Sequence, residues 1–190
     1  MRAAWRAMVA ATLAPERLIF VDECGTQTSL APIYGYAPKG DRLRLSVPRG
    51  RGKNTTLLSS MTVEGMGPSM AVEGATTAGV FEAYVEKVLA PGLRAGQIVV
   101  MDKLGAHRPK RIEELIEARG CELLYLPSYS PDYNPIEEAF AKIKHLLREA
   151  AARSKEALLE AIGAALTAVS AAEARSFFEH AGYHQVGQLL

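Results

Sequence analysis

The chain has 190 residues, of which 48% are hydrophobic, and its 22 basic and 21 acidic side chains leave a formal net charge of +1. That length suits one domain with a sizeable core. No apolar run reaches the roughly 18 residues that a membrane-spanning helix needs. The near-neutral net charge gives no support by itself for nucleic-acid binding, although a local basic stripe would still permit it. The only two cysteines are far apart and fit neither a zinc spacing nor a disulfide framework, so we expect a cytoplasmic protein.

The first part of the chain is predicted to hold a helix and three strands. Residues 2–13 have helical spacing and stop at Ala14-Pro15. Breaker residues make 25–53 irregular, and 64–68 is expected to be a hairpin turn. The three strands are expected at 17–22, 55–63 and 69–72. The first of them is a continuous apolar run, which is typical of a strand buried on both faces.

The second part alternates between helices and strands. The predicted elements are a helix at 81–89 capped by Thr76 or Thr77, a strand at 97–102, a helix opened by Pro109, a strand at 121–126, a helix opened by Pro135, and tail helices capped by Ser154 and Ser170. Asn134 is expected to be the N-cap of the helix that Pro135 opens. An antiparallel start followed by strand–helix alternation predicts an α/β fold, a mixed five-stranded sheet with helices on both faces and extra C-terminal helices.

Two aspartates stand at the carboxyl ends of predicted strands, where parallel sheets gather functional residues. Asp22 ends the first apolar strand and Asp102 ends the strand at 97–102. If these strands are neighbours, the two carboxylates raise one another's pKa unless a cation sits between them. Mg²⁺ prefers such oxygen ligands, and two such ions promote in-line phosphoryl displacement. The alternative is that both side chains only bind the amides of turns.

Glu137 is a third candidate ligand. It lies at the edge of the apolar stripe of its helix, which suits an acid that projects towards the strand ends. Alternatively, it reaches back to the amide of Asn134 as the partner in a helix cap. Its neighbour Glu138 is expected only to pair with Lys142, four residues later on the solvated face.

Three sequence blocks surround these acids: VDECG at 21–25, VVMDKLGAH at 99–107 and LPSYSPDYNPIE at 126–137. They resemble the signature blocks of the mariner-superfamily transposases of bacterial insertion sequences, the IS-six-thirty type. The last block is the most distinctive, and the 34 residues between Asp102 and Glu137 are the spacing typical of that superfamily. The similarity runs from about Arg17 to Tyr183.

The resemblance implies a ribonuclease H-like fold, in agreement with the predicted strand order, and a metal-binding triad of Asp22, Asp102 and Glu137. It further implies a transposase catalytic domain, an endonuclease that uses two Mg²⁺ or Mn²⁺ ions to cleave DNA at insertion-sequence ends and to join the freed 3′ hydroxyl to target DNA. The implied partners are double-stranded DNA, as transposon ends and a TA target, and a second copy of the chain. Neither a membrane nor a small-molecule substrate is expected, and the protein would be associated with the nucleoid.

Two features depart from the family pattern. Lys103 stands where the family usually has Asn, and its charge either competes for Asp102 or is aimed at the opposite face by the strand pleat. Only 21 residues precede Asp22, too few for the helix-turn-helix modules of full transposases. We therefore expect residues 1–15 to be an N-terminal helix remnant and 16–190 to be the catalytic domain. The alternatives are a catalytically impaired DNA-binding remnant of a decayed or split transposase, and a different ribonuclease H-like nuclease, which the third block argues against.

Two basic clusters are candidates for contacts with the DNA backbone. Their members are Arg42, Arg44, Arg49, Arg51 and Lys53 in the first, and His107, Arg108, Lys110 and Arg111 in the second. Glycines in the first cluster would expose backbone amides to phosphates, and a helix amino terminus favours a phosphate at the second. The alternatives are a solvated loop and, for His107, a structural hydrogen bond within its loop. Trp5, Tyr34 and Tyr36 are expected to pack rather than to stack on bases.

Overall fold

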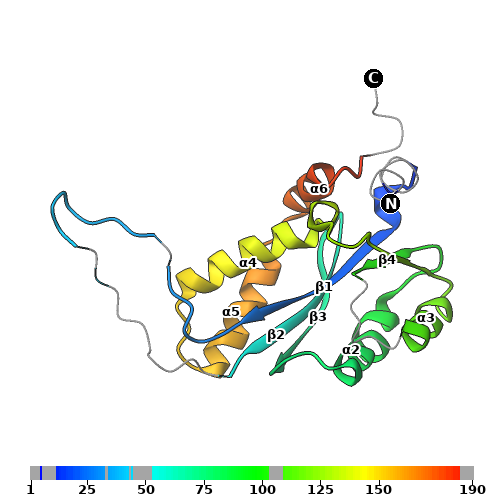
Figure 1. Cartoon of the computed structure of the whole chain (residues 1–190), viewed down its shortest axis with the longest axis horizontal. Coiled ribbons are helices and arrows are strands. Elements are labelled where there is room, and N and C mark those ends of the chain that lie inside the picture. Colours follow the sequence, from blue (N-terminus) through cyan, green and yellow to red (C-terminus); the bar gives the residue numbers. More distant parts are fainter. Residues whose placement is uncertain are drawn as a thin grey trace.

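The computed structural model describes residues 5, 12–32, 34–42, 44, 53–102 and 109–184, and the predicted helix at 2–13 lies largely outside them. A mixed five-stranded sheet in the order β3-β2-β1-β4-β5 forms the centre (Figure 1). The strands are β1 (Leu18–Thr26), β2 (Thr55–Thr62), β3 (Gly65–Glu73), β4 (Ile98–Met101) and β5 (Glu122–Tyr125). Strands β1, β2 and β3 pair antiparallel, whereas β4 pairs parallel to both β1 and β5. The predicted mixed sheet is therefore confirmed.

The central strand β1 is apolar on both faces because helices cover both faces of the sheet. Leu18 and Phe20 point into one core, and Ile19 and Val21 point into the other. The side-chain alternation of a strand divides this one apolar run between two hydrophobic cores.

Helices cover the two faces of the sheet in two groups (Figure 1). The first core is closed by α4 (Ile136–Ala150), α5 (Lys155–Thr167) and α6 (Ala171–His180). The second is closed by α2 (Ala78–Tyr84), the π-helical turn η3 (Val85–Leu89), η4 (Ala90–Gly92) and α3 (Pro109–Glu117). The predicted caps Thr77, Ser154 and Ser170 are confirmed, each accepting a backbone N–H from three residues ahead.

The predicted hairpin between β2 and β3 is confirmed, but its turn is shorter than the expected 64–68, because β3 already begins at Gly65, which pairs with Thr62. Only Val63 and Glu64 connect the two strands. Gly65 has φ +128°, a conformation that glycine adopts at no steric cost. Pro68 is tolerated inside β3 because that strand is at the edge of the sheet, where a missing N–H breaks no ladder.

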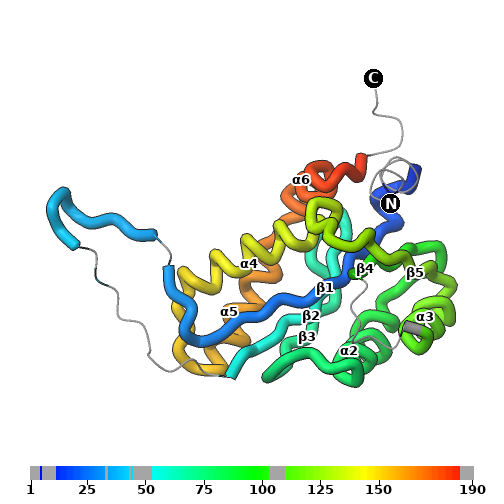
Figure 2. The backbone as a smooth tube through the Cα atoms, in the orientation of Figure 1, coloured from blue at the N-terminus to red at the C-terminus, as the bar shows by residue number. Residues whose placement is uncertain are grey.

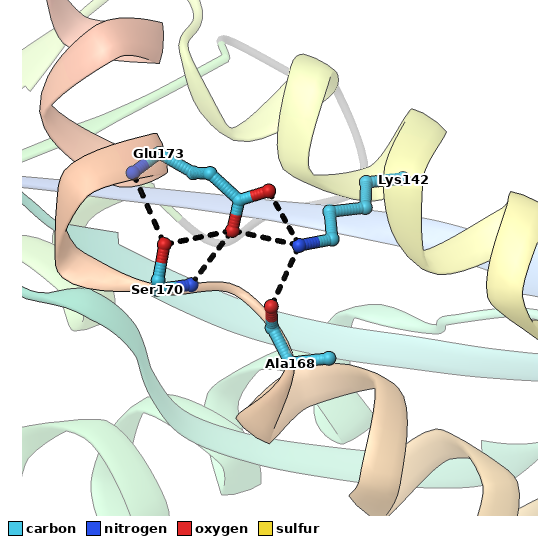
Figure 3. Close-up of polar contacts among 4 residues, drawn as sticks. All are labelled: Lys142, Ala168, Ser170 and Glu173. Atoms are coloured by element: carbon cyan, nitrogen blue, oxygen red, sulfur yellow. Dashed lines mark hydrogen bonds and ion pairs between the residues drawn. The ribbon is translucent and has the colours of Figure 1, made fainter.

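A polar cluster ties the turn between α5 and α6 to α4 (Figure 3). The Lys142 ammonium donates to the Glu173 carboxylate at 2.6 and 2.7 Å and to the Ala168 carbonyl at 2.6 Å. Glu173 also accepts the Ser170 N–H at 3.0 Å and so completes a capping box. The predicted pair of Glu138 with Lys142 is therefore wrong, since Glu173 from a later helix takes Lys142.

The chain from Thr28 to Arg44 forms an arm that leaves the body beyond the end of α4 (Figure 2). Arg153 holds its base by donating to the carbonyls of Thr28 and Leu30, both at 2.9 Å. Among the described residues, no single helix is long and apolar enough to cross a membrane; α5 and α6 reach that length and composition only as a pair, which is bent by 76°.

Candidate functional site

Asp22 and Asp102 lie side by side where β1 and β4 part. The last parallel pair of these strands joins Val21 to Met101, and each aspartate is the next residue along its strand. Asp22 follows Phe20 by two residues, so both aspartates point towards the face that α4 covers. The sequence predicted that Asp22 ends β1. This is wrong, because β2 continues to pair with β1 as far as Thr26.

Glu137 reaches the same place from the first turn of α4. The neighbouring Ile136 and Phe140 are buried in the core and fix the rotation of the helix, while Glu137 itself is exposed. A pocket of about 350 Å³ opens here, lined by Asp102, Ser128, Tyr129, Ser130, Pro131, Asn134 and Glu137. The structure therefore brings the three predicted acids to one site.

The pKa of Asp22 reflects the closeness of the other two acids. The pKa of Asp22 is raised to about 7, and burial is the largest cause. The negative charges of Glu137 and Asp102 contribute to the rise, while hydrogen bonds from the Glu23 backbone and the Asn134 side chain lower the pKa. Partial burial also raises the pKa of Asp102. The site thus accumulates negative charge that a bound cation would relieve.

Asn134 connects Asp22 to the pocket, and its predicted role as a helix N-cap is wrong. The N-cap of α4 is Pro135, without a side-chain hydrogen bond. The Asn134 side chain instead donates from Nδ2 to Asp22 Oδ2 at 2.8 Å, while its Oδ1, the atom that would accept in a cap, is buried without a hydrogen-bond partner. The Asn134 N–H binds the Pro131 carbonyl at 2.9 Å, so it is engaged there rather than with Glu137.

Tyr183, just after α6, holds the loop that carries Asn134. Tyr183, which is buried after α6, donates to the Tyr133 carbonyl at 2.8 Å, and Trp5 donates to the Tyr183 hydroxyl at 3.1 Å. Trp5 therefore packs, as predicted. The same prediction is wrong for Tyr34 and Tyr36, which are 89% and 103% exposed on the arm.

The donor atoms at this site suit a hard divalent cation. Each Asp22 oxygen accepts one hydrogen bond and keeps a further lone pair. Asn134 is only 4% exposed, and its Oδ1 is buried without a hydrogen-bond partner. In the described part of the chain no group of three or more Asp, Glu, His or Cys side chains is arranged to hold a metal ion. Mg²⁺ does not require one, because it retains waters and substrate phosphates beside one or two carboxylates.

The candidate DNA contacts are only partly within the described structure. Lys103, Arg49, Arg51, His107 and Arg108 lie outside the described residues. Lys53 forms an ion pair with Glu73 at 2.6 Å, and Lys110 is exposed at the start of α3. Arg111 pairs with Glu86 at 3.3 Å and is turned towards η3.

The sequence prediction missed Lys144 as a neighbour of the acids. Lys144 lies on α4, seven residues after Glu137 and therefore on the same side of the helix. Burial raises the pKa of the Cys24 thiol, and the Lys144 ammonium opposes that rise, which places this ammonium against β1 at Cys24, two residues after Asp22. The seven-residue spacing was the available signal.

Comparison with known proteins gives a family and a fold. Residues 17–159 match the model of the DDE superfamily endonucleases. The fold resembles that of a pre-cleavage Mos1 transpososome (TM-score 0.71, 16% identity, 95% of this chain and 56% of that chain) and of a Mos1 mariner paired end complex with Mn (0.70, 18%, 95% and 56%). It also resembles the catalytic domain of Mos1 mariner transposase (0.60, 16%, 95% and 82%). The chain thus spans about half the length of the Mos1 chains in the assembled complexes. None of the curated proteins compared with it matches.

Proposed function

The chain belongs to the DDE superfamily endonucleases, and we propose that it is the catalytic domain of a mariner-superfamily transposase of the insertion-sequence type. Its reaction is the cleavage of DNA at the ends of a mobile element and the joining of the freed 3′ hydroxyl to target DNA. The observation that carries this proposal is that Asp102 and Glu137 line one pocket and that both act electrostatically on Asp22, which stands beside Asp102 on the neighbouring strand.

The three carboxylates are the proposed ligands for two divalent ions, which supply Lewis-acid activation of the attacking oxygen and stabilisation of the leaving oxygen when bound. Mos1 paired end complexes solved with Mn and with Mg support the choice of ion. Asn134 holds the Asp22 carboxylate in one orientation through its 2.8 Å hydrogen bond. The amino end of α4 stabilises the negative charge of the Glu137 carboxylate through the helix dipole.

DNA is the proposed substrate, contacted through its phosphates by basic residues around the pocket. The proposed contacts are Arg49, Arg51, Lys53, His107, Arg108 and Lys110, to which the position of Lys144 adds a seventh. For Lys53 to contribute, a phosphate must compete with Glu73 for its ammonium. The finer proposals are a TA target, a homodimer, a catalytic domain that spans 16–190 and a location at the nucleoid. The packing of α5 and α6 into the first core supports the domain boundary.

A cleavage and strand-transfer assay in Mn²⁺ tests the proposal on labelled DNA that carries the element's own ends. Asp22→Asn, Asp102→Asn and Glu137→Gln should each abolish the products, while Glu138→Gln should retain them. Glu138 is the matched control because it follows Glu137 directly but faces the His180 ring, at 3.2 Å. Products that survive all three acid substitutions would refute the assignment.

The alternative of an impaired remnant rests on Lys103 alone, and the family match and the fold do not favour it. The same assay separates it from an active enzyme. A wild-type chain without products, together with a Lys103→Asn variant that forms them, would identify the remnant.

A further inference from the structure

We infer that Glu23 is a positioning residue for Lys103: its carboxylate binds the Lys103 ammonium and so holds that charge away from Asp102. Lys103 lies outside the described residues, whereas the surroundings of Glu23 are described. The consequence for metal binding rests on the proposed function, but the ion pair itself does not.

Glu23 is on the face of the sheet opposite to the acidic pocket. It follows Asp22 in β1, so its side chain points the other way, and it is paired with Leu58 of β2. Leu58 and Val21, two residues before Glu23, both belong to the second core. Strand β1 continues beyond its last pair with β4, which joins Val21 to Met101 (Figure 1). Glu23 therefore lies at the boundary of the second core, just past the end of β4.

One carboxylate oxygen of Glu23 is buried without a donor. Its Oε2 atom has no hydrogen-bond partner within the described part of the chain. Arg111, a cation at the start of α3 on this face, is engaged with Glu82, Glu86 and Glu114. A buried acceptor that lacks a donor costs its full desolvation penalty, and buried charges are normally paired. The position of Glu23 thus calls for a cationic donor.

Lys103 is the cation that the strand register offers. Asp102 follows Met101 directly and stands beside Asp22, one step past the last parallel pair. Side chains alternate between the two faces of extended backbone, so the residue after Asp102 is directed to the face that carries Glu23. The ammonium of a lysine is carried on a flexible four-carbon stem, which lets it reach a carboxylate on the neighbouring strand.

This pair accounts for the departure of the chain from the family pattern at position 103. The family usually has Asn there, and an Asn amide donates hydrogen bonds as a Lys ammonium does. Both residue types satisfy the Glu23 carboxylate, whereas an apolar residue does not. A lysine held on this face does not compete with a divalent ion for Asp102, so the acids keep their affinity for the ion.

Urea unfolding in EDTA tests the pair with Glu23→Met, Lys103→Met and the double variant. Each single variant should unfold at a lower urea concentration than wild type, because it leaves one charge without its partner. The double variant should recover most of this loss, with a coupling of roughly tenfold in the folding equilibrium constant. If Glu23 had no partner, Glu23→Met would instead raise the urea midpoint by removing an unpaired carboxylate. That result, or additive effects of the two substitutions, would overturn the inference.

Lys110→Met is the matched control for Lys103→Met. Lys110 is exposed at the start of α3, and its substitution removes the same charge at a place that Glu23 is not expected to reach. Combined with Glu23→Met, it should therefore give an additive shift of the urea midpoint. A recovery as large as that of the Lys103→Met double variant would overturn the inference, since any loss of a positive charge would then be sufficient.

Calorimetric titration with Mn²⁺ tests the consequence for the acids. Lys103→Asn should bind Mn²⁺ as tightly as wild type, whereas Glu23→Met should bind it about tenfold more weakly, because it releases the ammonium beside Asp102. Lys103→Asn added to Glu23→Met should restore the affinity, which a merely structural role of Glu23 would not produce. Tighter binding by Lys103→Asn than by wild type would overturn the inference, since Lys103 would then compete for Asp102. A wild type that binds no Mn²⁺ would contradict the proposed function, and the urea experiment would still decide the pair.

Discussion

Replacing Asp22 by Asn should stabilise the metal-free protein at high pH, although it removes a proposed metal ligand. The pKa of Asp22 is raised to about 7 in the folded protein from an ordinary 3.8. Between these values the folded state holds a proton that the unfolded state has released, so stability falls as the pH rises from about 4 to about 7. The ionised Asp22 therefore destabilises the folded wild-type protein most above pH 7.

The size of this penalty follows from the same two values. The interval from 3.8 to about 7, at about 1.36 kcal/mol per pKa unit, corresponds to about 4 kcal/mol. Asn provides one acceptor oxygen instead of two, so one of the bonds from Glu23 or Asn134 is lost at about 1 kcal/mol. The expected net gain is roughly 3 kcal/mol at pH 8, and it should turn into a loss of about 1 kcal/mol near pH 4.

Urea unfolding in EDTA, compared between the variant and wild type at pH 4, 6 and 8, measures this difference and cancels the titration of all shared groups. Asp41→Asn, on the exposed arm, is the matched control because it makes the same substitution away from the site. Added Mg²⁺ should stabilise wild type at pH 8 and leave Asp22→Asn nearly unchanged, because only a folded state that binds the ion gains stability. A difference between variant and wild type that is the same at pH 4 and pH 8 would refute the reasoning.

Three further predictions concern the surroundings of the site. Hydrogen bonds from Lys142 and Ser170 lower the pKa of Glu173 to about 2 from an ordinary 4.5. Glu173→Gln should therefore be less stable than wild type above pH 4.5. The difference between their urea unfolding midpoints should disappear as the pH falls towards 2. Phe20→Ala should lower the free energy of unfolding by about 3–5 kcal/mol, since its fully buried ring contacts two other aromatic rings at centroid distances of 5.1 and 5.3 Å; thermal unfolding with an unchanged midpoint would contradict this. Asn134→Ala should weaken Mn²⁺ binding roughly 10- to 100-fold in calorimetric titration, and an unchanged affinity would remove its role in orienting Asp22.

Local patterns predicted the fold well wherever one element decided its own conformation. The run from Leu18 to Val21 in β1 is apolar at every position, and the two cores on either side of the sheet explain why. Helix starts at Thr77, Ser154 and Ser170 followed from capping chemistry that needs only neighbouring residues. The candidate acids were recognisable because acids at the ends of parallel strands are common at functional sites and because the surrounding blocks resemble a known family.

Two of the errors share one physical cause, which is competition from residues distant in sequence. Lys142 was expected to pair with Glu138 but binds Glu173, 31 residues away. Asn134 is well placed as a cap, yet it donates to Asp22, 112 residues away, where the acceptor is charged. Reasoning from local sequence considers only the partners within a few residues of a side chain. It cannot identify a partner that is distant in sequence and becomes a neighbour only in the folded protein.

By itself, the sequence determined the mixed sheet and the helix caps at Thr77, Ser154 and Ser170, and it singled out the three acids as candidates, because periodicity, capping and motif spacing all depend on nearby residues. Only the tertiary structure decided that Asp22 and Asp102 are adjacent steps on paired strands, that Glu137 closes the same pocket, and that Asn134 holds Asp22. These are properties of distances between elements, and such distances exist only once the two cores have packed.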